Sequence, residues 1–119
     1  MPANTQRPVD LLTSAFDLNQ RRKFVVTNAA GDTVLEVYLK PITRAERLKA
    51  NTLAGSDEAL LVSTQLLCLK AELKDGTKAF APADAAKLQR ELPEDVLNDL
   101  ELFLFGLGNK GEIEDAKKS

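Results

Sequence analysis

The sequence predicts an α+β fold that is mostly α-helical, with an N-terminal β-hairpin followed by a bundle of about four helices. Two observations predict the hairpin: residues 23–28 and 33–40 are strand-like runs, and Gly31 lies in the short turn between them. A third observation predicts the helices, because residues 43–105 alternate between apolar segments and typical helix start and stop residues. No internal repeat is present, and the 119 residues fit one domain.

A short amphipathic segment precedes the hairpin. Val9, Leu12 and Phe16 recur at intervals of three and four residues, which is the spacing of one helix face. A helix this short is not stable alone in water, so we expect it to lie on a surface: that of a partner, or the open face of the hairpin. Residues 1–7 are polar and are expected to be a flexible arm.

The second strand-like run alternates between apolar and polar side chains. One face of the ribbon is expected to carry Leu35, Val37 and Leu39, and the other Glu36, Tyr38 and Lys40. Alternation of this kind predicts that the hairpin packs against the rest of the domain through its apolar face.

The first two helices of the bundle are defined by their ends. Thr43 and Glu46 fit a capping box that starts a helix reaching about residue 53 and ending at Gly55. Ser56 is the expected cap of the second helix, over residues 57–73. Apolar residues cover most of the circumference of this second helix, so it is expected to be the central buried helix.

The remaining helices begin at prolines, which favour the first turn of a helix. They are expected over residues 82–92 and 93–105. Residues 8–109 would then form a single globular domain, and residues 110–119 a disordered charged tail.

The composition argues against catalysis and against nucleic acid as a partner. The chain has no histidine, which is the commonest general base and zinc ligand, and its one cysteine, Cys68, lies among leucines where a core role is expected. Sixteen basic residues against eighteen acidic ones weigh against phosphate binding. No apolar run approaches the about 20 residues that cross a bilayer. We therefore expect no enzymatic activity, no cofactor or metal, and no nucleic-acid or membrane partner.

The last predicted helix is unusually apolar. Leu97, Leu100 and Leu104 form one stripe, while Leu102, Phe103 and Phe105 point in other directions. Either the helix is buried on all sides, or one side contacts a partner or another copy of the chain. The candidate partner-binding residues are Leu12, Phe16, Leu100, Phe103, Phe105 and Leu107.

The order of these segments resembles that of tail assembly chaperones of long-tailed bacteriophages. The likeness covers residues 8–109, and its individual motifs are short. They are Phe16-Asp17-Leu18, the stretch from Leu39 to Arg47, Cys68-Leu69, the stretch from Asp75 to Phe80, the stretch from Ala83 to Leu88, Leu92-Pro93, and a last helix reaching Asn109.

The resemblance implies a function without catalysis. Members of this family coat the tape-measure protein, keep it soluble and help to recruit tail-tube subunits, and they leave before the tail is finished. The implied partners are therefore the tape-measure protein and the tail-tube protein, with self-association as a further expectation. The implied location is the host cell cytoplasm, with the protein absent from the mature virion.

Two other functions remain open at this stage. The chain could be a small structural tail or baseplate protein that is retained in the virion, which would place it in purified particles. It could also be a small regulator that reads DNA, although its net charge of −2 opposes that function.

Overall fold

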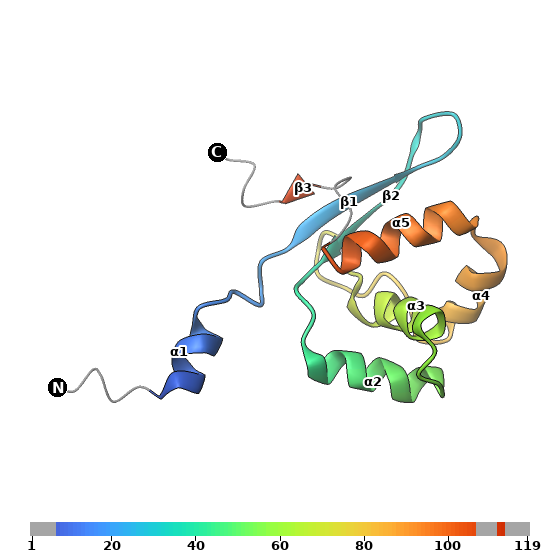
Figure 1. Cartoon of the computed structure of the whole chain (residues 1–119). Helices are drawn as coiled ribbons and strands as arrows, with labels where there is room; N and C mark the ends of the chain where they lie inside the picture. Colours follow the sequence, from blue (N-terminus) through green and yellow to red (C-terminus); the bar gives the residue numbers. More distant parts are fainter. Residues whose placement is uncertain (1–6, 107–111, 114–119) are drawn as a thin grey trace.

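The structure is a computed structural model that describes residues 7–106 and 112–113. Its elements are α1 (Pro8–Ser14), β1 (Arg22–Thr27), β2 (Thr33–Leu39), α2 (Arg44–Ala54), α3 (Ala59–Lys70), α4 (Asp84–Glu91), α5 (Glu94–Leu104) and β3 (Glu112–Ile113). The predicted fold class is confirmed: a hairpin is followed by four helices in an α+β fold that is mostly α (Figure 1).

The hairpin forms as the sequence predicts. β1 and β2 are antiparallel, with Phe24 opposite Val37, and Gly31 takes a φ of +88° in the turn. The Asn28 side chain closes that turn by accepting hydrogen bonds from the amides of Ala30 and Asp32, at 2.9 and 3.0 Å. β3 pairs with the other edge of β1, which gives the strand order β2-β1-β3.

Residues 112–113 of β3 belong to the tail for which the sequence predicts no order. The rest of that tail, residues 110–111 and 114–119, lies outside the described residues, as does most of the N-terminal arm.

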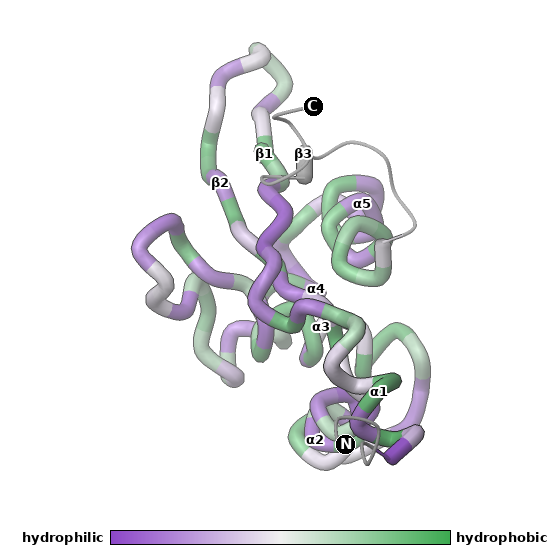
Figure 2. The backbone as a smooth tube through the Cα atoms, turned by 90° about the vertical axis from the view of Figure 1, so that its left-hand side faces the viewer, coloured by the Kyte–Doolittle hydropathy of each residue, from purple (hydrophilic) through white to green (hydrophobic). Residues whose placement is uncertain are grey.

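The core lies between the hairpin and the helices. α3 supplies Leu66 and Leu67, which are fully buried, and α5 lies along the hairpin in both views (Figures 1 and 2). The rings of Phe24 on β1 and Phe103 on α5 lie 5.0 Å apart, a separation typical of stabilising aromatic pairs. Most residues of α3, the second helix of the bundle, are buried, so its predicted central position is confirmed.

Tyr38 lies on the strand face opposite Val37, as predicted, but it is not open to solvent there. Tyr38 is buried because the segment after α3 pairs with β2: the amide of Tyr38 donates to the Glu72 carbonyl at 2.8 Å, and the reverse bond is 2.9 Å. The Arg21 guanidinium lies 4.5 Å from the centre of the Tyr38 ring. Both faces of this part of the hairpin are thus covered, which alternation alone does not reveal.

The capping box of α2 is confirmed. The Glu46 amide donates to the Thr43 hydroxyl at 3.2 Å, and the Thr43 amide donates to the Glu46 carboxylate at 3.0 Å. The other Glu46 oxygen accepts from the Lys70 ammonium at 2.7 Å, so the cap also joins α2 to α3. Burial by itself would raise the pKa of Glu46, but Lys70 and the Thr43 amide outweigh it and lower that pKa. Gly55 ends α2 with a φ of +68°, as predicted.

The predicted ends of α3 are wrong. Ser56 is not its N-cap, because the Ser56 hydroxyl accepts from the Glu58 amide at 3.0 Å and the helix begins at Ala59. The helix ends at Lys70 rather than near residue 73, since Glu72 is extended and bridges Tyr38 and Lys78. α4 and α5 begin one or two residues later than predicted and end one residue earlier.

Glu101 is a buried carboxyl that sequence patterns do not single out. Its side chain pairs with the Thr64 hydroxyl of α3 at 2.6 Å. Burial raises the pKa of Glu101, the Thr64 hydroxyl opposes the rise by stabilising the carboxylate, and the charge of Glu94 adds to it. The protonated form is therefore favoured by folding.

Replacing the capping threonine, Thr43→Ala, should lower the free energy of unfolding by about 1 kcal/mol, because one amide at the start of α2 loses its acceptor. Urea denaturation measures the change. Thr52→Ala is the matched control: Thr52 is exposed within the same helix, and its hydroxyl bonds only to the Leu48 carbonyl. An equal loss in both variants would contradict the role of the cap.

The variant Glu101→Gln should change how stability depends on pH. The folded pKa of Glu101 is raised, so wild-type stability is fully present below the unfolded pKa and falls as pH rises through the folded pKa. The amide of the variant does not titrate. Its stability relative to wild type should therefore increase between pH 4 and pH 7, as measured by urea denaturation. An unchanged difference at the two pH values would refute this, and Glu36→Gln on the exposed edge of the hairpin is the control.

Candidate protein-binding site

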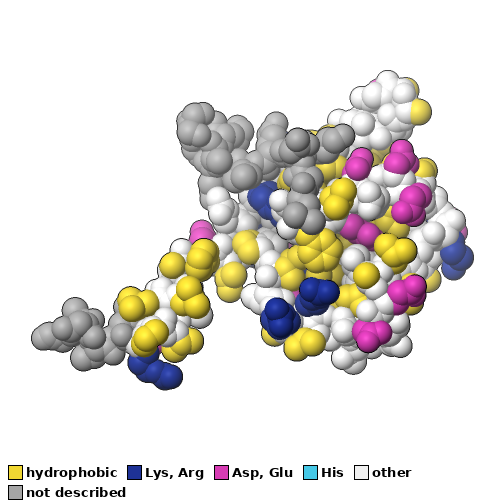
Figure 3. Space-filling model, in the orientation of Figure 1, with side chains coloured by type: hydrophobic (Ala, Val, Ile, Leu, Met, Phe, Trp, Pro, Cys, Tyr) yellow, Lys and Arg dark blue, Asp and Glu magenta, His cyan; other side chains and the backbone are white. Residues whose placement is uncertain are grey.

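The α1 segment, defined here as residues 8–18, is the most exposed apolar part of the described chain. Its five large apolar side chains are 48–67% exposed: Val9, Leu11, Leu12, Phe16 and Leu18. No residue of α1 is buried, and the helix projects from the body (Figures 1 and 3). The segment does not cover the open face of the hairpin, so that expectation is wrong.

Local contacts give α1 its helical shape. Pro8 stands in the first turn, and the hydroxyls of Thr13 and Ser14 donate to the carbonyls of Val9 and Asp10 at 2.9 and 2.7 Å. Seven residues are too few to hold a helix in water without a packing surface. Within the described chain, α1 therefore lacks the packing surface that a helix of this length needs.

The candidate residues at the end of the chain divide between core and surface. Leu100 and Phe103 are core residues, 3% and 2% exposed, so the intact fold offers neither of them to a partner. At these two positions, the predicted burial of the last helix is confirmed. Phe105 is 38% exposed, and Leu107 lies outside the described residues.

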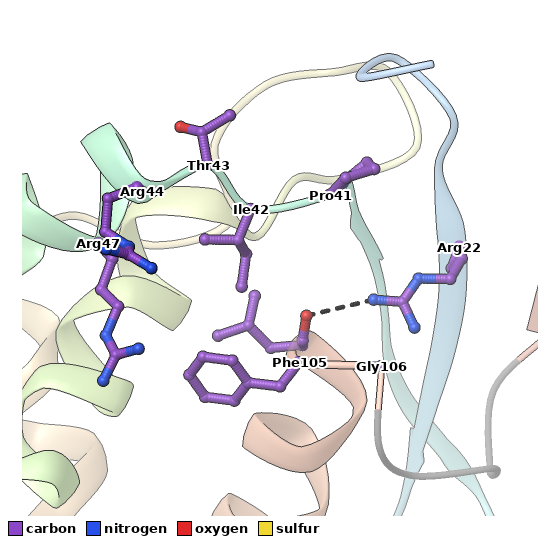
Figure 4. A pocket seen from close by; sticks show the side chains of 9 residues that line it. Arg22, Pro41, Ile42, Thr43, Arg44, Arg47, Phe105 and Gly106 are labelled. Atoms are coloured by element: carbon purple, nitrogen blue, oxygen red, sulfur yellow. Dashed lines mark hydrogen bonds between the residues drawn. The ribbon is translucent and has the colours of Figure 1, made fainter. Parts of the chain in front are cut away.

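Phe105 borders a groove with a volume of about 520 Å³ (Figure 4). The groove lies between the start of β1, the segment joining β2 to α2, the first turns of α2, and the end of α5. Its apolar residues are Pro41, Ile42, Leu104 and Phe105, and its charged residues are Arg22, Arg44 and Arg47. We call this feature the arginine groove. No carboxylate of residues 7–106 lines it.

Arg22 forms one wall of the arginine groove. Its guanidinium lies 4.5 Å from the centre of the Phe103 ring and donates to the Leu104 carbonyl at 3.2 Å (Figure 4). The cation thus meets both an aromatic face and the negative end of the α5 dipole. Burial lowers the pKa of Arg22 from its usual value.

Arg44 and Arg47 form the opposite rim. Both are exposed, and neither forms an ion pair with a carboxylate of residues 7–106. Arg44 is the first residue of α2, where the helix dipole disfavours a positive charge. The charge of Arg44 therefore does not stabilise the start of its own helix, and the two cations give the groove a positive rim able to attract carboxylates.

The described residues show no arrangement for nucleophilic or metal chemistry. Burial, with smaller contributions from Asp84 and Glu101, raises the pKa of the Cys68 thiol to about 12, so the reactive thiolate is scarce at neutral pH. Within residues 7–106, no three histidine, cysteine, aspartate or glutamate side chains gather as metal ligands. No helix in the described part of the chain is long and apolar enough to cross a membrane.

Sequence reasoning identified part of this site. It selected Leu12, Phe16 and Phe105, whose exposure the structure supports. It missed Ile42 and the arginines, because three segments that are distant in the sequence assemble the groove. The one local indication was Arg44, a cation at a helix start where acids are favoured.

Comparison with protein-family models finds no matching family, and searches of curated proteins and of solved structures find no match.

Truncating the two phenylalanines near the end of α5 should separate core from surface. Phe103→Ala should lower the free energy of unfolding by about 3–5 kcal/mol, since a fully buried ring is lost. Phe105→Ala should cost less, about 1 kcal/mol, because this side chain is already 38% exposed. Urea denaturation measures both. Similar losses in the two variants would contradict the division of α5 into a buried and a free side.

Proposed function

We propose that this protein is a bacteriophage tail assembly chaperone that binds the tape-measure protein and helps to recruit tail-tube subunits. It acts by contact and not by catalysis, in the host cell cytoplasm, and it leaves before the virion is complete. The order of sequence segments over residues 8–109 supports the family, and the exposed apolar surfaces support the mode of action.

The observation that carries this proposal is the α1 segment, which displays five large apolar side chains while using none of them in its own fold. Exposed apolar surface of this kind marks sites that contact other proteins. A long helical client offers matching apolar stripes. Leu12 and Phe16 are the side chains of the segment that are most exposed, and they are the contacts we assign to the client.

The arginine groove is the second contact we assign to the client. Amphipathic helices commonly bind by laying apolar side chains into such a groove. A helix with acidic residues beside its apolar stripe would meet Ile42 and Phe105 at the base and Arg44 and Arg47 at the rim. Several copies bound along one client would strengthen one another through multivalency.

The test is co-expression of the full chain with fragments of the very long helical protein that we expect to be encoded beside it. We expect the fragments to become soluble and to co-purify with the chain. The variant Leu12→Ser/Phe16→Ser should weaken binding at least tenfold, because apolar anchors of an interface commonly contribute more than 1 kcal/mol each. Isothermal titration calorimetry measures the affinity.

Leu60→Ser is the matched control, since Leu60 on α3 is 64% exposed, the same fraction as Leu12, and lies outside both surfaces. Fragments that stay insoluble and unbound would refute the chaperone function. Mass spectrometry of purified virions tests the alternative: stoichiometric amounts of this chain in the particle would identify a structural tail or baseplate protein instead.

A further inference from the structure

We propose that the arginine groove of one copy of this chain binds the α1 segment of a second copy. The inference rests on the proposed function in treating both surfaces as binding sites, and it makes a second copy and the client alternative occupants of them. One surface is the α1 segment, whose apolar side chains have no packing surface in their own chain. The other is the groove rimmed by Arg44 and Arg47, which offers apolar side chains and positive charge.

The charges of the two surfaces are complementary. The α1 segment contains two acidic residues, Asp10 and Asp17, and no lysine or arginine, so its formal charge is −2; Arg7 precedes it as the N-cap of the helix. Among the described residues, the groove is lined by three arginines and by no acid, so this lining has a formal charge of +3. Attraction between opposite charges at a partly dry contact supports both the orientation and the rate of docking.

The apolar parts also match in kind and size. A volume of about 520 Å³ lies within the range of pockets that hold a small ligand, about 300–1,000 Å³, so it suits a few side chains and not a whole domain. Leu12 lies in the last turn of α1, and Phe16 follows two residues after the helix ends at Ser14, so both side chains can enter the groove together. Docking would bury the face that α1 needs to become stable.

The connection between α1 and the hairpin favours a second copy over the chain's own groove. Asp17 accepts from the Asn19 amide at 2.9 Å and from the Gln20 amide at 3.4 Å, which makes a turn directly before β1. Arg21 then packs on the Tyr38 ring, on the side of the hairpin opposite Phe24 and α5. In the structure α1 projects away from the body of its own chain (Figure 1), and a segment from an incoming copy leaves the turn and these contacts intact.

This contact is head-to-tail. Each docked pair leaves one free α1 segment and one free groove, so further copies can add, and growth continues until a ring closes or a filament forms. The proposed contact therefore predicts a mass that rises with concentration. It also predicts that a chain with an altered groove and a chain with an altered α1 segment form a dimer to which no further copy can add.

Sedimentation velocity over a range of concentrations tests the proposal with three full-length proteins. The average mass of the wild type should lie above the 13.0 kDa of one chain and should rise with concentration. The groove variant Arg44→Glu/Arg47→Glu and the segment variant Leu12→Ser/Phe16→Ser should each remain at 13.0 kDa. An equimolar mixture of the two variants should give a particle of twice that mass, because one intact segment and one intact groove remain.

The control variant Lys49→Glu/Lys74→Glu reverses the same number of charges outside the groove and should associate like the wild type. Glutamates at positions 44 and 47 lie near the start of α2, where the dipole favours them, so the groove variant should fold, and circular dichroism checks this.

A wild type that stays monomeric, a groove variant that still associates, or a mixture that does not pair would each overturn the proposal. A monomeric wild type that still binds the tape-measure fragment would overturn only this inference, and an associating wild type that does not bind it would overturn only the proposed function.

Discussion

The attachment of α5 to β1 is the interaction on which the rest of the structure depends. Arg22 holds the end of α5 through the Phe103 ring and the Leu104 carbonyl, and the Phe24 ring packs against Phe103 at 5.0 Å. These contacts close the core over α3. They also fix Leu104 and Phe105 beside the first turn of α2, so the arginine groove is a consequence of the same attachment.

The apolar residues of this chain serve two separate purposes. Those of α3 and the inner side of α5 are buried and provide the free energy of folding, since burial of apolar surface is its main favourable term. Those of the α1 segment and Phe105 face water and contribute little to the stability of one chain. The proposed contact with another protein would account for their exposure, and Arg44 and Arg47, which form no ion pair within residues 7–106, would give that contact a preference for acidic partners.

Local sequence rules predicted the parts of the fold that local interactions determine. The capping box of Thr43 and Glu46 and the turn at Gly31 are short-range features, and both formed as predicted. The burial of Tyr38 and the extended conformation of Glu72 depend on pairing between segments more than thirty residues apart, which alternation cannot show. The arginine groove escaped prediction for the same reason. The surface residues of α5 were predicted only in part, because an all-round apolar helix does not reveal which side the core will cover.

Hydrogen–deuterium exchange of the α1 amides tests most directly the central claim that these exposed surfaces bind protein. In the dilute chain, the account predicts rapid exchange throughout Pro8–Ser14, because no residue of that helix is buried. Exchange should slow when the chain is concentrated or when the tape-measure fragment is added, while the amides of α3 stay protected throughout. Amides of α1 that are protected in the dilute chain, or that exchange equally fast with and without a partner, would contradict the account.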